Sequence, residues 1–199
     1  MTATGVVVVT SLCARQWVGH RQAPRMTVQT LREVRSVGRI VVCNFTSGDL
    51  PYDLDAEVVR MPQSWSGPPP MSVVYAAIEK LALDAVVVCC HPETPLLSPA
   101  TVEKCAEAVL AGVHVAQTGL EADAWLPAHP GGPLVEAVAV VPVLGCRAFR
   151  GTYDWGRFPA GLAAGTAIRP VLVPRKEALS LADPGDLELV QALEFAGSV

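Results

Sequence analysis

Three arginines stand close together in one polar segment that directly follows a run of β-branched residues: Arg15, Arg21 and Arg25. A guanidinium group binds phosphate through paired hydrogen bonds and keeps its charge at any physiological pH. The segment, residues 11–25, contains one glycine, Gly19, and no lysine. The three arginines are therefore candidates for contacts with phosphate. The alternative is an arginine-bearing surface loop with Trp17 folded onto the core.

Two further polar segments also follow apolar runs. Residues 61–72 are dense in proline, serine and glycine and end at Ser72, which predicts a helix start. Such a helix N-terminus favours an anion or a carbonyl group, although a plain cap needs no ligand. Residues 91–98 carry His91 and Glu93. Because ligands of open α/β sheets bind at the carboxyl ends of the strands, all three segments are expected to border one site.

The elements that must hold these loops are short apolar runs. Continuous runs rich in β-branched residues are typical of strands that are buried on both faces of a parallel sheet. We predict strands at residues 5–10, 39–44, 56–60, 85–90, 113–117, 136–141 and 171–174.

Helix start signals alternate with these runs. The candidate caps are Thr27, Ser72, Ser98 and Asp183. Proline directly follows the last two, as is typical of the first helical position, and Gly38 and Gly112 are the expected ends of two of the helices. This alternation predicts one α/β domain over residues 1–199, a Rossmann-like, three-layer α/β/α arrangement with a mostly parallel sheet.

Composition narrows the class of partner and compartment. The net charge of -4 argues against nucleic acid as the main partner, because binding to a phosphate backbone requires clustered lysines and arginines. No apolar run is long enough to cross a membrane, and no secretory signal pattern begins the chain. The six cysteines include no CxxC pair, and most lie in apolar segments. Reduced, buried thiols in a cytoplasmic protein are therefore expected.

Three stretches together resemble one family of enzymes: Ser72–Val73, the segment from Cys90 to Pro99, and the segment from Ser180 to Leu189. They resemble the cytidylyltransferases that activate methylerythritol phosphate or sugars of the sialic-acid type. The resemblance implies the nucleotide-diphospho-sugar transferase fold. It also implies transfer of a nucleotidyl group from CTP, with Mg²⁺, to a small phosphorylated or acidic-sugar acceptor, with release of pyrophosphate.

The resemblance also implies roles for particular residues. The segment from Ser11 to Arg25 takes the place of the family's phosphate-cradling loop, so its three arginines become candidates for catalysis, and Ser11 and Gly19 candidates for nucleotide binding. Gly67 and Ser72 match a cytidine-recognition element, in which an expected arginine is replaced by prolines. His91 is also a candidate for nucleotide binding, and it falls where one branch of the family has the aspartate that holds magnesium.

Several acidic and basic residues of the family are replaced in this chain. Histidine is a poor magnesium ligand, so Glu93 is the remaining candidate there, and a solvated loop charge is its alternative. Near the C-terminus, the positions of the family's metal-binding aspartates are Ser180 and Ala182, and Lys176 is the nearby candidate for a catalytic cation.

A weaker similarity concerns the acceptor and the assembly of the protein. The segment from Cys146 to Arg150 resembles a family segment that shapes the acceptor pocket, which makes Arg147 and Arg150 candidates for substrate binding. Residues 118–134 form a long excursion, and the family uses a matching one as an arm that reaches a second subunit. We therefore expect a homodimer in which Trp125 and Leu126 contact the partner.

The replaced residues leave two hypotheses open. The first is an active cytidylyltransferase. The second is a diverged homologue that no longer transfers nucleotides and serves as a binding or scaffold subunit, or catalyses another reaction in the same pocket. The two hypotheses differ at the magnesium site, which only the first requires.

Overall fold

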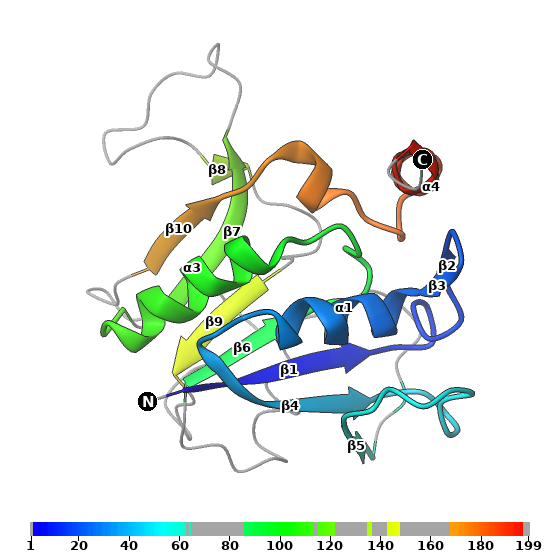
Figure 1. The fold of residues 1–199 in the computed structure, drawn as a ribbon, viewed down its shortest axis with the longest axis horizontal. Helices are drawn as coiled ribbons and strands as arrows, with labels where there is room; N and C mark the ends of the chain where they lie inside the picture. The colour runs from blue at the N-terminus through cyan, green and yellow to red at the C-terminus, as the bar shows by residue number, and fades with distance from the viewer. Residues whose placement is uncertain are drawn as a thin grey trace.

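The computed structural model describes residues 2–62, 64, 86–113, 115–121, 135–136, 143–147 and 168–196. In this part of the chain, eight strands form one sheet (Figure 1), whose main path has the order β10-β7-β9-β6-β1-β4-β5. The sheet is mostly parallel and is covered by helices, so the predicted α/β fold class is confirmed.

The parallel half of the sheet is built on β1 (Ala3–Val9), every residue of which is buried. β1 lies between β4 (Val37–Asn44) and β6 (Val86–Cys90) and is parallel to both. β5 (Glu57–Arg60) is parallel to β4 and forms the edge. The four β-branched runs therefore pair as neighbours, and the strands predicted from them are confirmed to within two residues at each end.

The other half of the sheet contains the one reversal of strand direction on the described path. β9 (Val143–Arg147) inserts between β6 and β7 (Val115–Glu121) and is antiparallel to both. β10 (Ile168–Leu172) lies parallel beside β7, and β8 (Val135–Glu136) pairs with the far end of β7. The strand β9 was not predicted.

Three predicted boundaries in this half are corrected. The strand expected at residues 171–174 is β10, which begins at Ile168 and ends at Leu172. β7 continues to Glu121, so residues 118–121 of the expected excursion belong to the sheet. The remainder of the excursion, with Trp125 and Leu126, lies outside the described residues. Of the strand expected at residues 136–141, only Glu136 is described, and it belongs to β8.

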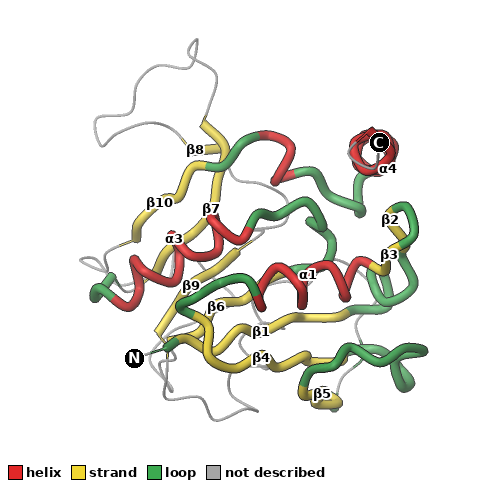
Figure 2. Tube along the Cα trace, in the orientation of Figure 1, coloured by secondary structure: helices red, strands yellow, loops and turns green. Residues whose placement is uncertain are grey.

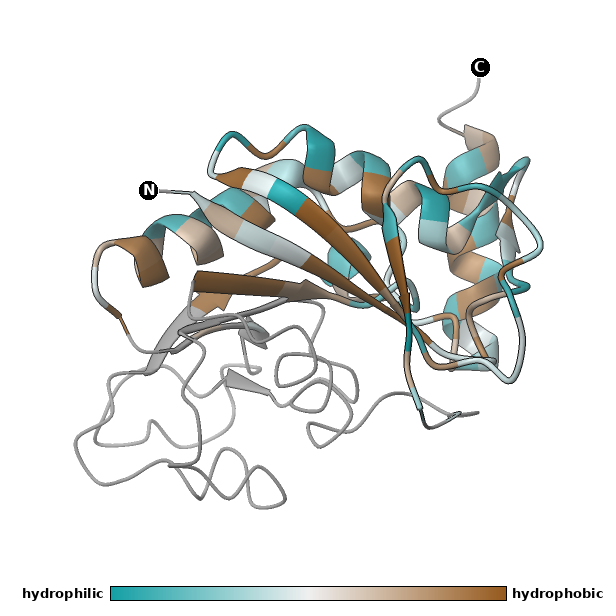
Figure 3. Cartoon of the chain, turned by 90° about the horizontal axis from the view of Figure 1, so that it is seen from below, coloured by the Kyte–Doolittle hydropathy of each residue, from teal (hydrophilic) through white to brown (hydrophobic). Residues whose placement is uncertain are grey.

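Helices α1 (Ala23–Arg32) and α3 (Pro99–Leu110) pack against each other on one face of the sheet (Figure 2). In Figure 3 the strands beneath them are largely hydrophobic, in agreement with a core built from buried valines and cysteines. The helix expected on Ser72, and with it the predicted second helical layer, lies outside the described residues.

The two ends of α1 differ from the prediction. The helix begins at Ala23, with Pro24 in its first turn, because proline has the required φ and no N–H to leave unpaired. Thr27 is therefore inside the helix, where its Oγ1 donates a hydrogen bond to the carbonyl oxygen of Ala23. The helix ends at Arg32, and Gly38, the expected end, belongs to β4.

The caps predicted for α3 and for α4 (Pro184–Ala196) are confirmed. The Ser98 hydroxyl accepts the N–H of Thr101 at 3.3 Å. The Asp183 carboxylate accepts the N–H groups of Gly185 and Asp186 at 2.8 and 3.2 Å. These bonds satisfy N–H groups that have no partner inside a helix. No helix in the described part of the chain is long and apolar enough to span a membrane.

A small hairpin between β1 and α1 packs against α4. It consists of β2 (Trp17–Val18) and β3 (Arg21–Gln22), which are antiparallel. Gly19 lies at its tip with a φ of 57°, a conformation that residues with a Cβ rarely adopt. Val18 is fully buried and packs in one cluster with Val190 of α4. The hairpin is therefore held by apolar contacts on its α4 side.

Candidate functional site

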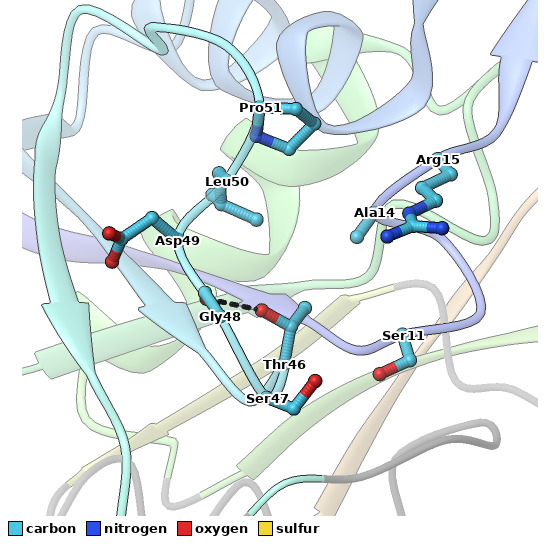
Figure 4. A pocket seen from close by; sticks show the side chains of 9 residues that line it. All are labelled: Ser11, Ala14, Arg15, Thr46, Ser47, Gly48, Asp49, Leu50 and Pro51. Atoms are coloured by element: carbon cyan, nitrogen blue, oxygen red, sulfur yellow. Dashed lines mark hydrogen bonds between the residues drawn. The ribbon is translucent and has the colours of Figure 1, made fainter.

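A cavity of about 370 Å³ opens at the carboxyl ends of β1 and β4 (Figure 4). One wall is the turn that follows β1, and the other is the loop that follows β4. Its lining residues are Ser11, Ala14, Arg15, Thr46, Ser47, Gly48, Asp49, Leu50 and Pro51. This is the edge of an open α/β sheet at which ligands bind.

The first wall is a compact turn rather than an open loop. The N–H of Ala14 donates to the carbonyl oxygen of Thr10 at 3.0 Å, and that of Gln16 donates to Cys13 at 3.1 Å. Cys13 and Ala14 are buried, whereas Ser11 and Arg15 are exposed. The turn therefore places one hydroxyl and one guanidinium group at the cavity.

The second wall is shaped by Asn44, the last residue of β4. Its Oδ1 accepts the N–H of Thr46 at 2.9 Å, and its Nδ2 donates to the carbonyl oxygen of Gly48 at 2.9 Å. The Thr46 hydroxyl donates to the same carbonyl at 2.7 Å. The loop is thus closed on itself, with Thr46 and Ser47 at the cavity, and in Figure 4 the Asp49 side chain points away from Arg15. Oδ1 of Asp49 lies 3.9 Å from Nη1 of Arg60.

Tyr52 joins the two walls. Its hydroxyl donates to the carbonyl oxygen of Ala14 at 2.8 Å, and burial raises its pKa, so the phenol remains a hydrogen-bond donor. The guanidinium carbon of Arg25 lies 5.8 Å from the centre of the Tyr52 ring, within the range of a cation–π contact. Arg25 therefore stands beside the cavity, although it does not line it.

The three arginines are not brought together. Arg15 lines the cavity, and Arg25 lies next to Tyr52, the residue that joins the two walls of the cavity. Arg21 points to α4, where its Nη2 is 2.8 Å from an Oε1 of Glu194. The structure thus associates two of the three with the cavity and engages the third in an exposed ion pair.

The two candidates from the 91–98 segment are buried, and Glu93 contacts the turn. His91 is 3% exposed, and burial lowers its pKa to about 4, so the imidazole is neutral at pH 7. Glu93 is 0% exposed, and its Oε1 accepts the Thr10 hydroxyl at 3.2 Å. Burial also raises the pKa of Glu93, beside the thiol of Cys13.

These surroundings do not fit magnesium at Glu93. Mg²⁺ requires several oxygen ligands in an octahedral arrangement and usually retains some of its water. In the described residues, no group of three histidines, cysteines, aspartates or glutamates is placed to hold a metal ion. A fully buried carboxyl group that favours its neutral form is poorly suited as a ligand.

The remaining predicted site residues lie away from the cavity or outside the described part. Lys176 is exposed on the short 3-10 helix η2 (Arg175–Ala178), and Gly19 is at the tip of the hairpin. Arg147 is the last residue of the antiparallel strand β9, and the helix expected after this segment lies outside the described residues. Gly67, Ser72 and Arg150 lie outside the described residues. The roles of all of these residues stay predictions.

The sequence interpretation missed the whole second wall. Residues 46–51 follow a predicted strand, so the rule that was applied to three other loops applied to this one as well. The local signal was also present, because an asparagine followed by threonine, serine and glycine favours a side-chain-stabilised turn.

Comparison with known proteins identifies the fold. No family model matches the sequence, and no curated protein matches it. Among solved structures, 2-C-methyl-D-erythritol 4-phosphate cytidylyltransferase from Thermus thermophilus is similar at a TM-score of 0.69 and 18% identity, over 98% of this chain and 100% of that one. A CMP:2-keto-3-deoxy-manno-octonic acid synthetase solved with CTP is similar at a TM-score of 0.71 and 12% identity, over 100% of both chains.

A third structure, 4-diphosphocytidyl-2C-methyl-D-erythritol synthase from Anaerococcus prevotii, has a TM-score of 0.67 and 12% identity over 98% of each chain. The chain therefore has the fold of these cytidylyltransferases, and the resemblance inferred from the sequence is confirmed at the level of the fold.

Proposed function

We propose that the protein binds a nucleoside triphosphate, with CTP favoured, at the cavity between the turn after β1 and the loop after β4. The observation that carries this proposal is the placement of Arg15 with the hydroxyl side chains of Ser11 and Ser47 at the carboxyl edge of the sheet. The Thr46 hydroxyl also lines the cavity, but it donates its proton to the carbonyl oxygen of Gly48. The similarity to a synthetase solved with CTP supports the choice of nucleotide.

The proposed reaction is nucleotidyl transfer. An oxygen of a small phosphorylated or acidic-sugar acceptor attacks the α-phosphorus of the nucleotide. The bond between that phosphorus and the oxygen bridging to the β-phosphorus breaks, and pyrophosphate leaves. Arg15, with Arg25 beside it, would offset the negative charge on the phosphates. Such catalysis depends on positioning and charge stabilisation rather than on a covalent intermediate.

Calorimetric titration with each of the four nucleoside triphosphates, with and without Mg²⁺, tests the binding step. We expect Arg15→Ala to weaken CTP binding roughly tenfold or more, which corresponds to the loss of a hydrogen bond to a charged group. Arg21→Ala is the matched control, because Arg21 is engaged with Glu194 instead of lining the cavity. Equal loss in both variants, or no binding of any nucleotide at millimolar concentration, would contradict the proposal.

A second candidate function is binding without transfer, in a diverged homologue. The observation that favours it is the absence, within the described residues, of a side-chain cluster that fits a metal ion. A pyrophosphate-release assay distinguishes the two functions. Saturable nucleotide binding without pyrophosphate release, across a panel of sugar acids and sugar phosphates, would favour the binding protein.

A further inference from the structure

Glu93 joins three segments that are far apart in the sequence. Its Oε1 accepts the hydroxyl of Thr10 at 3.2 Å, at the end of β1, and the thiol of Cys13 interacts with the same carboxyl group. Its backbone carbonyl oxygen accepts the N–H of Leu181 at 2.7 Å, from the segment that precedes α4. The side chain is 0% exposed, so these contacts are made away from solvent.

In the described part of the chain, no cation pairs with this carboxyl group, and the effect of its burial on the pKa outweighs that of its hydrogen bonds. Among the described residues, its Oε2 has no hydrogen-bond partner, and none of the ion pairs includes it. Burial of an ionised carboxylate without a cation is strongly unfavourable, whereas the protonated acid avoids that penalty and gains a donor.

The titratable neighbours are uncharged as well. From the turn, burial raises the pKa of the Cys13 thiol well above its ordinary value. From its own loop, burial lowers the pKa of His91 to about 4. Tyr52, which reaches the turn from the loop after β4, also has a raised pKa. The segment before α4 meets Glu93 at its backbone carbonyl rather than at its carboxyl group. Among the described residues, the groups that act on the carboxyl are hydrogen-bonding ones, Thr10, Cys13 and the backbone of Glu93 itself.

The same carboxyl group is coupled to the cavity through Thr10. The N–H of Thr10 donates to the sulfur of Cys13 at 3.3 Å, and the Cys13 thiol donates to the carbonyl oxygen of Thr10 at 3.6 Å. The N–H of Ala14 donates to that carbonyl too. These contacts close the turn that carries Ser11 and Arg15.

We propose that Glu93 is a positioning residue that works as an uncharged carboxylic acid, holding the turn at residues 10–16 so that Ser11 and Arg15 face the cavity. The role differs from that of a metal ligand, and it rests on the proposed function only in the identity of the ligand that Arg15 meets. Ionisation of Glu93 draws the carboxylate toward water and opens the turn. The equilibrium constant for opening of the turn therefore depends on pH. It increases roughly tenfold per pH unit at pH values between the ordinary pKa of a glutamate and the raised pKa of Glu93 in the closed turn.

Alkylation of Cys13 measures this opening without any nucleotide. Iodoacetamide labelling between pH 5 and 9 is followed by peptide mass spectrometry, with Cys105 of α3, which is buried as well, as the internal reference. The labelling rates of the parent and of Glu93→Gln are compared at the same pH, so that the pH dependence of the intrinsic reactivity of the thiol cancels. We expect the ratio of the Cys13 labelling rate in the parent to that in Glu93→Gln to be smallest at pH 5 and to rise at least tenfold at high pH.

Two further variants complete the labelling test. Thr10→Val removes the hydroxyl at similar volume, so it should speed labelling at every pH. Glu93→Ala should also do so where it folds, whereas Glu93→Gln keeps the shape and the neutral state. Identical pH profiles of the parent and Glu93→Gln would overturn the proposal, and so would labelling of Glu93→Gln as fast as that of Thr10→Val at pH 5.

Calorimetry with CTP connects the turn to the cavity. The dissociation constant of the parent, divided by that of Glu93→Gln, should rise from pH 6 to pH 8 in proportion to the reciprocal of the closed fraction that the labelling measures. If no nucleotide binds, the proposed function fails, and the labelling experiment still decides the role of Glu93. Titration with MgCl₂ or MnCl₂ alone tests the alternative, because metal binding by the folded parent that Glu93→Gln abolishes would overturn the proposal.

Discussion

The turn at residues 11–16 and the hairpin at residues 17–22 are adjacent in the sequence and carry arginines of identical chemistry, yet they serve different parts of the molecule. The turn rests on buried polar groups and presents Arg15 to the cavity. The hairpin rests on apolar side chains of α4 and engages Arg21 in an ion pair. Neighbouring arginines of one loop can therefore have different roles, one in binding and one in packing. The role depends on whether buried polar groups or apolar side chains support that part of the loop.

The largest expected difference between the two regions is in their response to acid. His91 is buried directly after β6, in the segment whose Glu93 contacts the turn, and its folded pKa of about 4 is below its ordinary value of 6.5. Between these values the unfolded chain binds a proton that the folded protein does not, so the unfolding free energy falls as the pH is lowered. We expect a loss of about 3 kcal/mol by pH 4 from this group.

His91→Gln isolates this loss, since all other titrating groups are common to both proteins. Urea unfolding at pH 7 and pH 4 should show that the stability difference between the parent and His91→Gln shrinks or reverses in acid. If the unfolding free energies of the parent and of His91→Gln changed equally between pH 7 and pH 4, the expected difference between the turn and the hairpin would be wrong.

The hairpin should be more sensitive to loss of apolar volume. Val18→Ala removes methyl groups from a fully buried side chain that packs with Val190. We expect the unfolding free energy to fall by about 2 kcal/mol, and CTP affinity of the folded protein to stay unchanged. Denaturant unfolding and calorimetry check the two halves of this prediction. A large loss of affinity would show that the hairpin also shapes the site.

Tyr52→Phe tests whether the walls of the cavity act together. The variant keeps the ring beside Arg25 and removes the hydroxyl that donates to Ala14. We expect a loss of about 1 kcal/mol in stability, with weaker CTP binding because the two walls are no longer joined. Val18→Ala provides the comparison, since it should change stability alone. Unaltered affinity in Tyr52→Phe would show that the walls are held independently.

The smallest effect is expected at Arg21. Its ion pair with Glu194 is exposed, and exposed pairs contribute about 0.2–1 kcal/mol. Arg21→Ala should therefore lower the unfolding free energy by less than about 1 kcal/mol, and the loss should decrease in high salt. A double-mutant cycle with Glu194→Ala measures the coupling. A coupling that is much larger, or insensitive to salt, would assign the hairpin arginine a greater structural role.

The sequence predicted the parallel half of the sheet well, because a run such as Gly5–Thr10 has one favourable environment, a strand buried on both faces. The caps at Ser98 and Asp183 were also predictable, since each is a local interaction between a side chain and the next few backbone groups. Each of these signals is complete within a few residues.

Features that depend on distant partners were not predictable in the same way. The hairpin consists of strands of two residues each, too short for any periodicity, and its packing depends on Val190. The burial of Glu93 depends on Thr10, at the end of another strand, so a loop charge and a buried acid look alike in the sequence. The insertion of β9 depends on edges supplied by β6 and β7.

That insertion has a consequence for the order of folding during synthesis. The strands β1, β4, β5 and β6 are complete once residue 90 has been made, whereas β9, which covers the other edge of β6, ends at residue 147 (Figure 1). Until then Val86–Cys90 is a wholly apolar edge strand with one side unpaired, the kind of surface that pairs with other chains. A chain that stops after α3 should aggregate on release from the ribosome, and the slowest folding step of the full chain should be the entry of β9 between its two neighbours.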